Sequence, residues 1–86
     1  IAANEGSPQA MFLLANAYRA GAGVPQNNQK AIELYEKAGE MEHPAALQAL
    51  SMAYQYGELG LSPDEAKART YSVEAEHAIR HPLAPP

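Results

Sequence analysis

The stretch YRAGAGVPQNNQKA, residues 18–31, places two glycines between two segments that both have a helical pattern. The stretch YQYGELGLSPDEAKA, residues 54–68, has the same order of Tyr, two glycines, a branched aliphatic residue and a Lys-Ala pair. A glycine just past a helix end adopts positive φ without a steric penalty. We therefore interpret both stretches as turns of helical hairpins, and we expect positive φ at Gly21 and Gly57.

The chain matches itself at an offset of 36 residues, which becomes 37 after Gly57 because the second copy has one extra loop residue. Leu14 thus corresponds to Leu50 and Tyr18 to Tyr54. Self-similarity at such a period is typical of helical repeat proteins. The predicted organisation is a repeat domain over residues 1–80 and a Pro-rich tail or exit linker over 81–86. Within the domain, residues 1–7 match the tail of an earlier repeat, followed by repeats at 8–43 and 44–80.

Each copy has the apolar periodicity of two amphipathic helices, as in the predicted stripe of Ala10, Leu13, Leu14, Ala17 and Tyr18. We predict helices over 8–20, 27–39, 44–56 and 63–78 and no strand. Ser7 and Ser62, each followed by Pro, are the predicted caps of the first and fourth helices. The predicted core has alanines at the closest helix crossings, around the larger side chains of Leu14, Tyr18, Leu34, Tyr35, Leu50, Tyr54 and Tyr71.

The composition favours closely packed helices and argues against several functions. Among the 86 residues 18 are alanine, and there is one Phe and no Trp or Cys. The net charge is −4, and the six Lys and Arg residues are scattered, so we expect no nucleic acid partner. The longest apolar run, residues 10–15, is too short to span a membrane. The chain does not begin with Met, and we expect it to be a fragment of a longer repeat array.

The residues AMFLLANAYRAGAGVPQNNQKAIELYEKAGE, 10–40, resemble the Sel-one-like repeat family, a relative of the tetratricopeptide repeats. Ala15 replaces the family's helix glycine and Asn27 its loop acid. The second copy, AALQALSMAYQYGELGLSPDEAKARTYSVEAE, 45–76, is looser. The resemblance implies an all-α fold, a right-handed α/α superhelix of about two antiparallel helical hairpins. It also implies an adaptor or scaffold that binds other proteins.

The sequence offers little chemistry for an enzyme. His77 and His81 are four residues apart with Glu74 one turn earlier, but Pro82 disfavours helix at His81, so we predict no metal site. Acidic pairs such as Glu40 with Glu42 are interpreted as solvated helix faces. We expect no cofactor and no catalytic residues, and a hydrolase is the weakest alternative.

The predicted function is binding of a protein or peptide partner, with a structural spacer inside a larger protein as the alternative. In stacked hairpins the first helix of each pair lines the concave side. By elimination and by analogy with the related repeats, the predicted binding residues are Gln9, Phe12, Asn16, Arg19, Gln48, Met52 and Gln55. Phe12 and Met52 offer apolar contacts, the amides can bind a peptide backbone, and Arg19 can bind a carboxylate. Phe12 packing against the next repeat is the competing interpretation.

Overall fold

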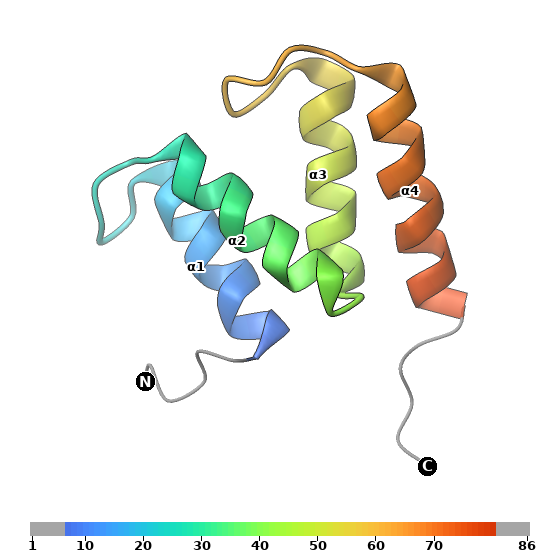
Figure 1. Cartoon of the computed structure of the whole chain (residues 1–86). Coiled ribbons are helices and arrows are strands. Elements are labelled where there is room, and N and C mark those ends of the chain that lie inside the picture. Colours follow the sequence, from blue (N-terminus) through green and yellow to red (C-terminus); the bar gives the residue numbers. More distant parts are fainter. Residues whose placement is uncertain (1–6, 81–86) are drawn as a thin grey trace.

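The computed structural model describes residues 7–80, and within them the chain is entirely helical apart from its turns. Four helices follow one another as two antiparallel hairpins (Figure 1). The predicted all-α fold of two helical hairpins is confirmed. Residues 1–6 of the predicted repeat tail (1–7) and the predicted Pro-rich tail at 81–86 lie outside the described residues. The helices are α1 (Pro8–Ala20), α2 (Asn28–Glu40), α3 (Pro44–Tyr56) and α4 (Glu65–Arg80).

Glycines in the left-handed conformation end both first helices. Gly21 follows α1 with φ 71° and Gly57 follows α3 with φ 68°, so the prediction of positive φ is confirmed. The glycine N–H groups donate to the carbonyls of Ala17 and Ala53, respectively, which satisfies acceptors that the helix leaves unpaired. At the other end of α1, the Ser7 side chain accepts a hydrogen bond from the Ala10 N–H, as a cap does.

The two second helices begin with equivalent caps. The Asn27 side chain accepts from the Lys30 N–H, and the Asp64 side chain accepts from the Lys67 N–H, both at 3.1 Å. α2 therefore begins one residue later than predicted, and α4 begins at Glu65, so the predicted cap at Ser62 is wrong. At the offset of 37 residues Asn27 corresponds to Asp64, so α2 and α4 begin at equivalent positions, and Ser62 lies in the loop. The extra residue is accommodated in the loop, which has positive φ at Leu59 and Gly60 after Gly57.

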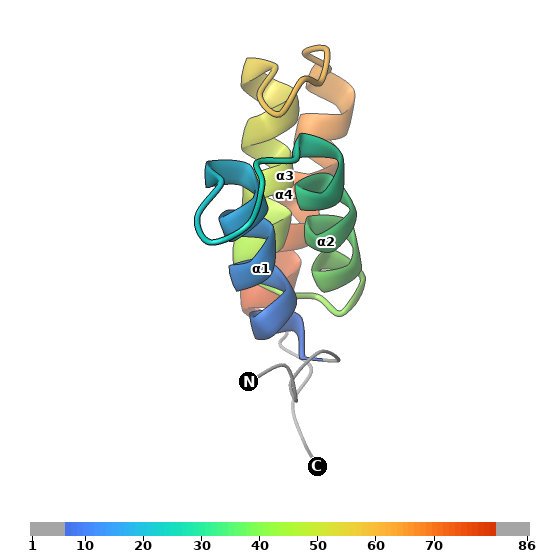
Figure 2. The same ribbon diagram turned by 90° about the vertical axis from the view of Figure 1, so that its left-hand side faces the viewer.

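The two hairpins pack on each other where α2 lies against α3. Viewed along the direction in which the two hairpins stack, α1 and α3 form one side of the molecule and α2 and α4 form the other (Figure 2). Gly39 permits the close approach of α2 to α3, since a Cβ there would lie 2.9 Å from Leu47 Cδ2. Alanines are prominent in the buried cluster, which consists of Ala15, Ala31, Tyr35, Ala38, Ala46 and Leu50. The prediction that they occupy the closest helix crossings stays a prediction.

The predicted core is confirmed at Tyr35 and Leu50 and is wrong at Leu14, and its other members are only partly buried. Tyr35 and Leu50 are fully buried, and the tyrosines at 18, 54 and 71 and Leu34 are half-buried. Leu14 is 43% exposed, which contradicts the prediction. Its equivalent, Leu50, is covered by the Gly39 end of α2. Within residues 7–80 no helix occupies the corresponding place in front of α1, and Ala15 is instead the buried centre of that helix.

Candidate protein-binding surfaces

The seven predicted binding residues lie on α1 and α3, the two helices that form one side of the molecule (Figure 2). Four of them have exposed side chains, whereas the other three make contacts inside the chain. The exposed ones are Gln9, Gln48, Met52 and Gln55.

Phe12 and Asn16 face the junction between the hairpins. The Phe12 ring lies 5.9 Å from the Tyr35 ring and 5.1 Å from the His43 ring, the latter edge-on. The Tyr35 hydroxyl donates a hydrogen bond to the side-chain oxygen of Asn16. A buried hydroxyl without a partner would be costly, so Asn16 has a structural role here.

Arg19 joins α1 to the loop that follows α3. Its guanidinium forms an ion pair with Glu58 at 2.7 Å, and both side chains are about one-third exposed. Hydrogen bonding to Tyr35 and Glu58 raises the pKa of Arg19 above its usual value, against an opposing effect of burial. Arg19 is therefore positioned by its own chain, and its predicted role in partner binding stays a prediction.

The equivalents of Phe12, Asn16 and Arg19 in the second repeat are Gln48, Met52 and Gln55, which are exposed. In the first repeat, Phe12 and Arg19 contact His43 and Glu58, which lie beyond their own hairpin. In residues 7–80 nothing covers the equivalent positions on α3.

Sequence reasoning missed two exposed apolar residues on the same side, Leu13 and Tyr56. Leu13 is 54% exposed and Tyr56 is 63% exposed. At about 100° per residue, Leu13 lies nearly opposite the buried Ala15, and Tyr56 nearly opposite Tyr54, which stacks on Tyr71 of α4. The sequence does contain a signal for the exposure of Leu13. The small residue Ala15 marks the side of α1 that packs closely on α2, and Leu13 lies on the opposite side.

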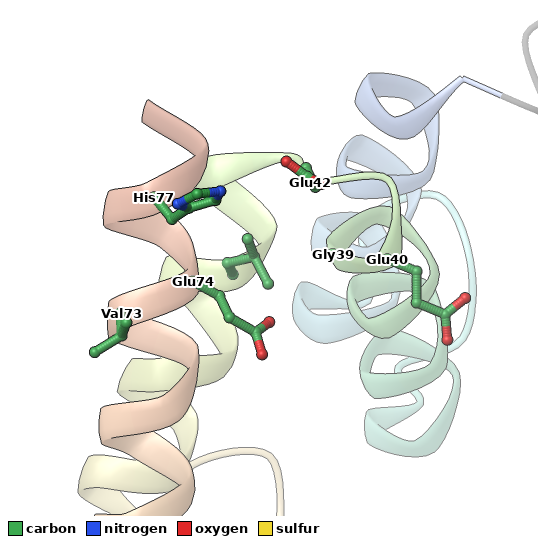
Figure 3. Close-up of a pocket in the computed structure, with 7 residues that line it drawn as sticks. Gly39, Glu40, Glu42, Val73, Glu74 and His77 are labelled. Atoms are coloured by element: carbon green, nitrogen blue, oxygen red, sulfur yellow. The ribbon is translucent and has the colours of Figure 1, made fainter. Parts of the chain in front are cut away.

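A second surface is a groove between α2 and α4, on the other side of the molecule (Figure 3). One part encloses about 410 Å³ and a smaller adjoining part about 240 Å³, and the two share Gly39, Glu40, Leu47 and Glu74. In Figure 3 the Glu74 side chain extends from α4 toward α2, whereas the Glu40 carboxylate turns away from α4. The remaining lining residues are Glu36, Glu42, Tyr71, Val73 and His77.

The groove is strongly acidic. The pKa of Tyr71 is raised first by burial and then by the negative charges around it, among them Glu36, Glu74 and Glu40. The ion pairs recorded for the described residues, Arg19–Glu58 and Arg80–Glu76, involve none of the groove carboxylates. From the sequence these acids are interpreted as separate solvated helix faces. Their position along one groove between α2 and α4 was not predicted.

Two absences concern the described residues alone. No group of three or more His, Cys, Asp or Glu side chains in residues 7–80 is arranged to hold a metal ion. His81, the second histidine of the spacing considered above, lies outside that range. None of the four helices has the length and apolar character needed to cross a membrane.

Comparison with known proteins identifies the repeat. The Sel1 repeat family model matches residues 8–43 and 44–75. The chain is 38% identical over 77 residues to an uncharacterized protein of Neisseria meningitidis serogroup B, covering 90% of this chain and 16% of that protein. It is 30% identical over 87 residues to chitin synthase regulatory factor 2 of Schizosaccharomyces pombe, covering 96% and 17%. This chain thus spans about a sixth of each relative. No solved structure matches it significantly.

Proposed function

Because the chain belongs to the Sel1 repeat family, whose helical solenoids are generally protein-interaction modules, we propose that it binds a peptide or helix of a partner protein along α1 and α3. It would act there as an adaptor. The name of one relative, a regulatory factor, supports a binding role over a catalytic one.

The observation that carries this proposal is the exposure of large apolar side chains on the α1 and α3 side. Leu13, Met52 and Tyr56 are each at least half exposed. Aromatic and Met side chains are enriched at protein interfaces, where they supply large contact areas. The exposed amides of Gln9, Gln48 and Gln55 flank them and offer both donors and acceptors to a peptide backbone.

Phe12, Asn16 and Arg19 contribute indirectly to such a surface. Their contacts with Tyr35, His43 and Glu58 fix how α1 sits against the rest of the chain. Replacing them would alter the fold as well as any binding, so they are poor test positions. The exposed residues allow a cleaner test.

The test is selection of peptides from a random 16-residue display library on this chain, followed by affinity measurements with purified variants. We expect selected peptides to lose at least about tenfold in affinity for a Leu13→Asp, Tyr56→Asp variant, because a buried charge without a partner is unfavourable. The matched control is Ile79→Asp, since Ile79 is 56% exposed but lies on α4. Circular dichroism establishes that each variant is folded.

Two results would contradict the proposal. The first is a library that yields no specific binder, which would favour the alternative of a structural spacer. The second is an equal loss of affinity in the Ile79→Asp control, which would move the binding surface away from α1 and α3.

A further inference from the structure

The groove between α2 and α4 combines an apolar floor with an acidic rim. Both helices pack on α3, and Leu47 of α3, which is 2% exposed, forms part of the floor with Gly39. Val73, 58% exposed, adds an apolar wall on α4. Glu36, Glu42 and Glu74 also line the groove, as does Glu40, whose carboxylate turns away from α4 (Figure 3).

Four of the ten acidic residues of the chain line the groove. The chain has ten acidic residues and six Lys and Arg residues, and its net charge is −4. No Lys or Arg is among the residues that line the groove in the described part of the chain. Among its charged Asp, Glu, Lys and Arg residues, the lining of the groove is therefore entirely acidic.

Helix geometry adds to this negative potential. Glu40 is the last residue of α2 and Glu42 follows it, at the end where the helix dipole is negative. A cation is the favoured neighbour at that end, and an acidic side chain there is unfavourable by a few tenths of a kcal/mol to about 1 kcal/mol. Glu40 and Glu42 therefore lie where a negative charge interacts unfavourably with the helix dipole. A positively charged ligand bound there would offset this interaction.

The backbone at Glu42 is strained in a way that favours glycine. Its φ is 59°, and its N–H donates to the Gly39 carbonyl while the His43 N–H donates to the Ala38 carbonyl. This is the helix-ending arrangement in which glycine is usual at the left-handed position. The equivalent position of the sequence 36 residues earlier is Gly6. A glutamate at residue 42 therefore stabilises the turn less than glycine would, while it supplies a carboxylate to the groove.

We propose that this groove is a second docking site, distinct from the α1 and α3 surface, and that it binds a basic amphipathic segment of a partner protein. The occupant carries a Lys or Arg whose methylene stem lies over Leu47 and Val73 and whose cationic group lies between Glu42 and Glu74. Long basic side chains commonly bury the stem and keep the charge at the rim. The groove volume of about 410 Å³ suits one or two such side chains rather than a whole domain.

The test uses a dye-labelled 14-residue peptide of Lys, Arg, Leu and Ala in an amphipathic helical order, and a control peptide with every Lys and Arg replaced by Gln. Binding to this chain is measured by fluorescence polarisation at low salt, where charge interactions are least screened. We expect the basic peptide to bind at least about tenfold more tightly than the neutral one. A Glu42→Gln, Glu74→Gln variant should bind it at least about fivefold more weakly than the unmodified chain.

The matched control is Glu33→Gln, Glu65→Gln, which removes the same charge from exposed positions of α2 and α4 outside the groove. We expect this control to change the affinity by less than about twofold. Equal weakening in both variants would show attraction to the net charge alone and would overturn the proposal. So would the absence of any preference for the basic peptide.

The apolar floor is tested separately with Val73→Ser at high salt, where the contribution of charge is reduced. We expect this exposed substitution to weaken binding further, because the peptide loses apolar contact. An unchanged affinity would mean that no side chain of the peptide lies over the floor, which contradicts the proposed mode. Since none of these variants alters Leu13 or Tyr56, failure here leaves the α1 and α3 proposal standing.

Discussion

Leu14 and Leu50 occupy equivalent positions in the two hairpins, yet Leu50 is fully buried and Leu14 is 43% exposed. The difference arises from the neighbouring helix rather than from the residue. The end of α2 at Gly39 covers Leu50, with 3.8 Å between Leu50 Cδ1 and the position of a Cβ at Gly39. The burial of this leucine therefore depends on whether the second helix of a preceding hairpin packs against it.

This relationship predicts unequal effects of the same substitution. Leu50→Ala should lower the free energy of unfolding by about 2–4 kcal/mol, because it leaves a cavity in the centre of the stack. Leu14→Ala should cost less than about 1 kcal/mol in this chain, since its side chain is already partly in water. Urea denaturation followed by circular dichroism compares the two. Equal losses would mean that Leu14 is as well packed as Leu50.

The turn glycines predict a second effect on stability. Gly21→Ala should lower the free energy of unfolding by about 1 kcal/mol or more, since Ala is disfavoured at the observed φ of 71°. A Cβ there would also lie 3.1 Å from Gln26 Cβ. Gly21→Asn is the control and should cost less, because Asn tolerates the left-handed conformation better. Thermal melting that finds Gly21→Ala more stable would contradict this account of the turn.

The features that sequence reasoning predicted correctly depend on local order. Gly21 and Gly57 end their helices because of their own conformational freedom, and the bounds of α1 and α3 follow from Ser7, the prolines and these glycines. The α4 start was missed because Ser62 and Pro63 have the same pattern as Ser7 and Pro8 at the start of α1, whereas the capping side chain is that of Asp64, the equivalent of Asn27.

The features that were missed depend on contacts between hairpins. The exposure of Leu14 and Leu13 depends on which helix lies in front of α1. The acidic groove brings Glu42 and Glu74 together from different helices, and neither has a sequence pattern that indicates the other. Phe12 contacts Tyr35 and His43, and Arg19 forms an ion pair with Glu58, which the sequence pattern does not indicate. Their predicted role in partner binding stays a prediction.

His43 predicts a dependence of stability on pH. Its Nε2 atom is buried and has no hydrogen-bond partner among the described residues, and burial lowers its pKa below the usual 6.5. The folded protein therefore binds a proton at His43 less readily than the unfolded chain does. This contribution to stability is fully present above the unfolded-state pKa and is lost as the pH falls through the lower folded-state pKa.

The melting temperature should consequently fall on acidification from about pH 7.5 toward pH 5, and His43→Gln should weaken this dependence. The comparison of slopes is informative even if the substitution lowers stability at every pH. Parallel curves for the two proteins would show that His43 is not the group responsible.

Glu42 provides a prediction in which stability and binding change in opposite directions. Glu42→Gly should raise the free energy of unfolding by about 1 kcal/mol, because glycine accepts the φ of 59° without strain and a negative charge is removed from the end of α2. That corresponds to a melting temperature about 4–8 °C higher for a domain of this size. The same variant should bind the basic peptide more weakly than the unmodified chain, since it lacks one rim carboxylate.

Glu42→Ala is the control, because it removes the charge and retains the strained Cβ, so it should gain less stability while losing similar affinity. If the glycine variant is no more stable than the alanine variant, the left-handed turn at Glu42 is not strained. If both variants bind the peptide as tightly as the unmodified chain, the Glu42 carboxylate takes no part in the groove.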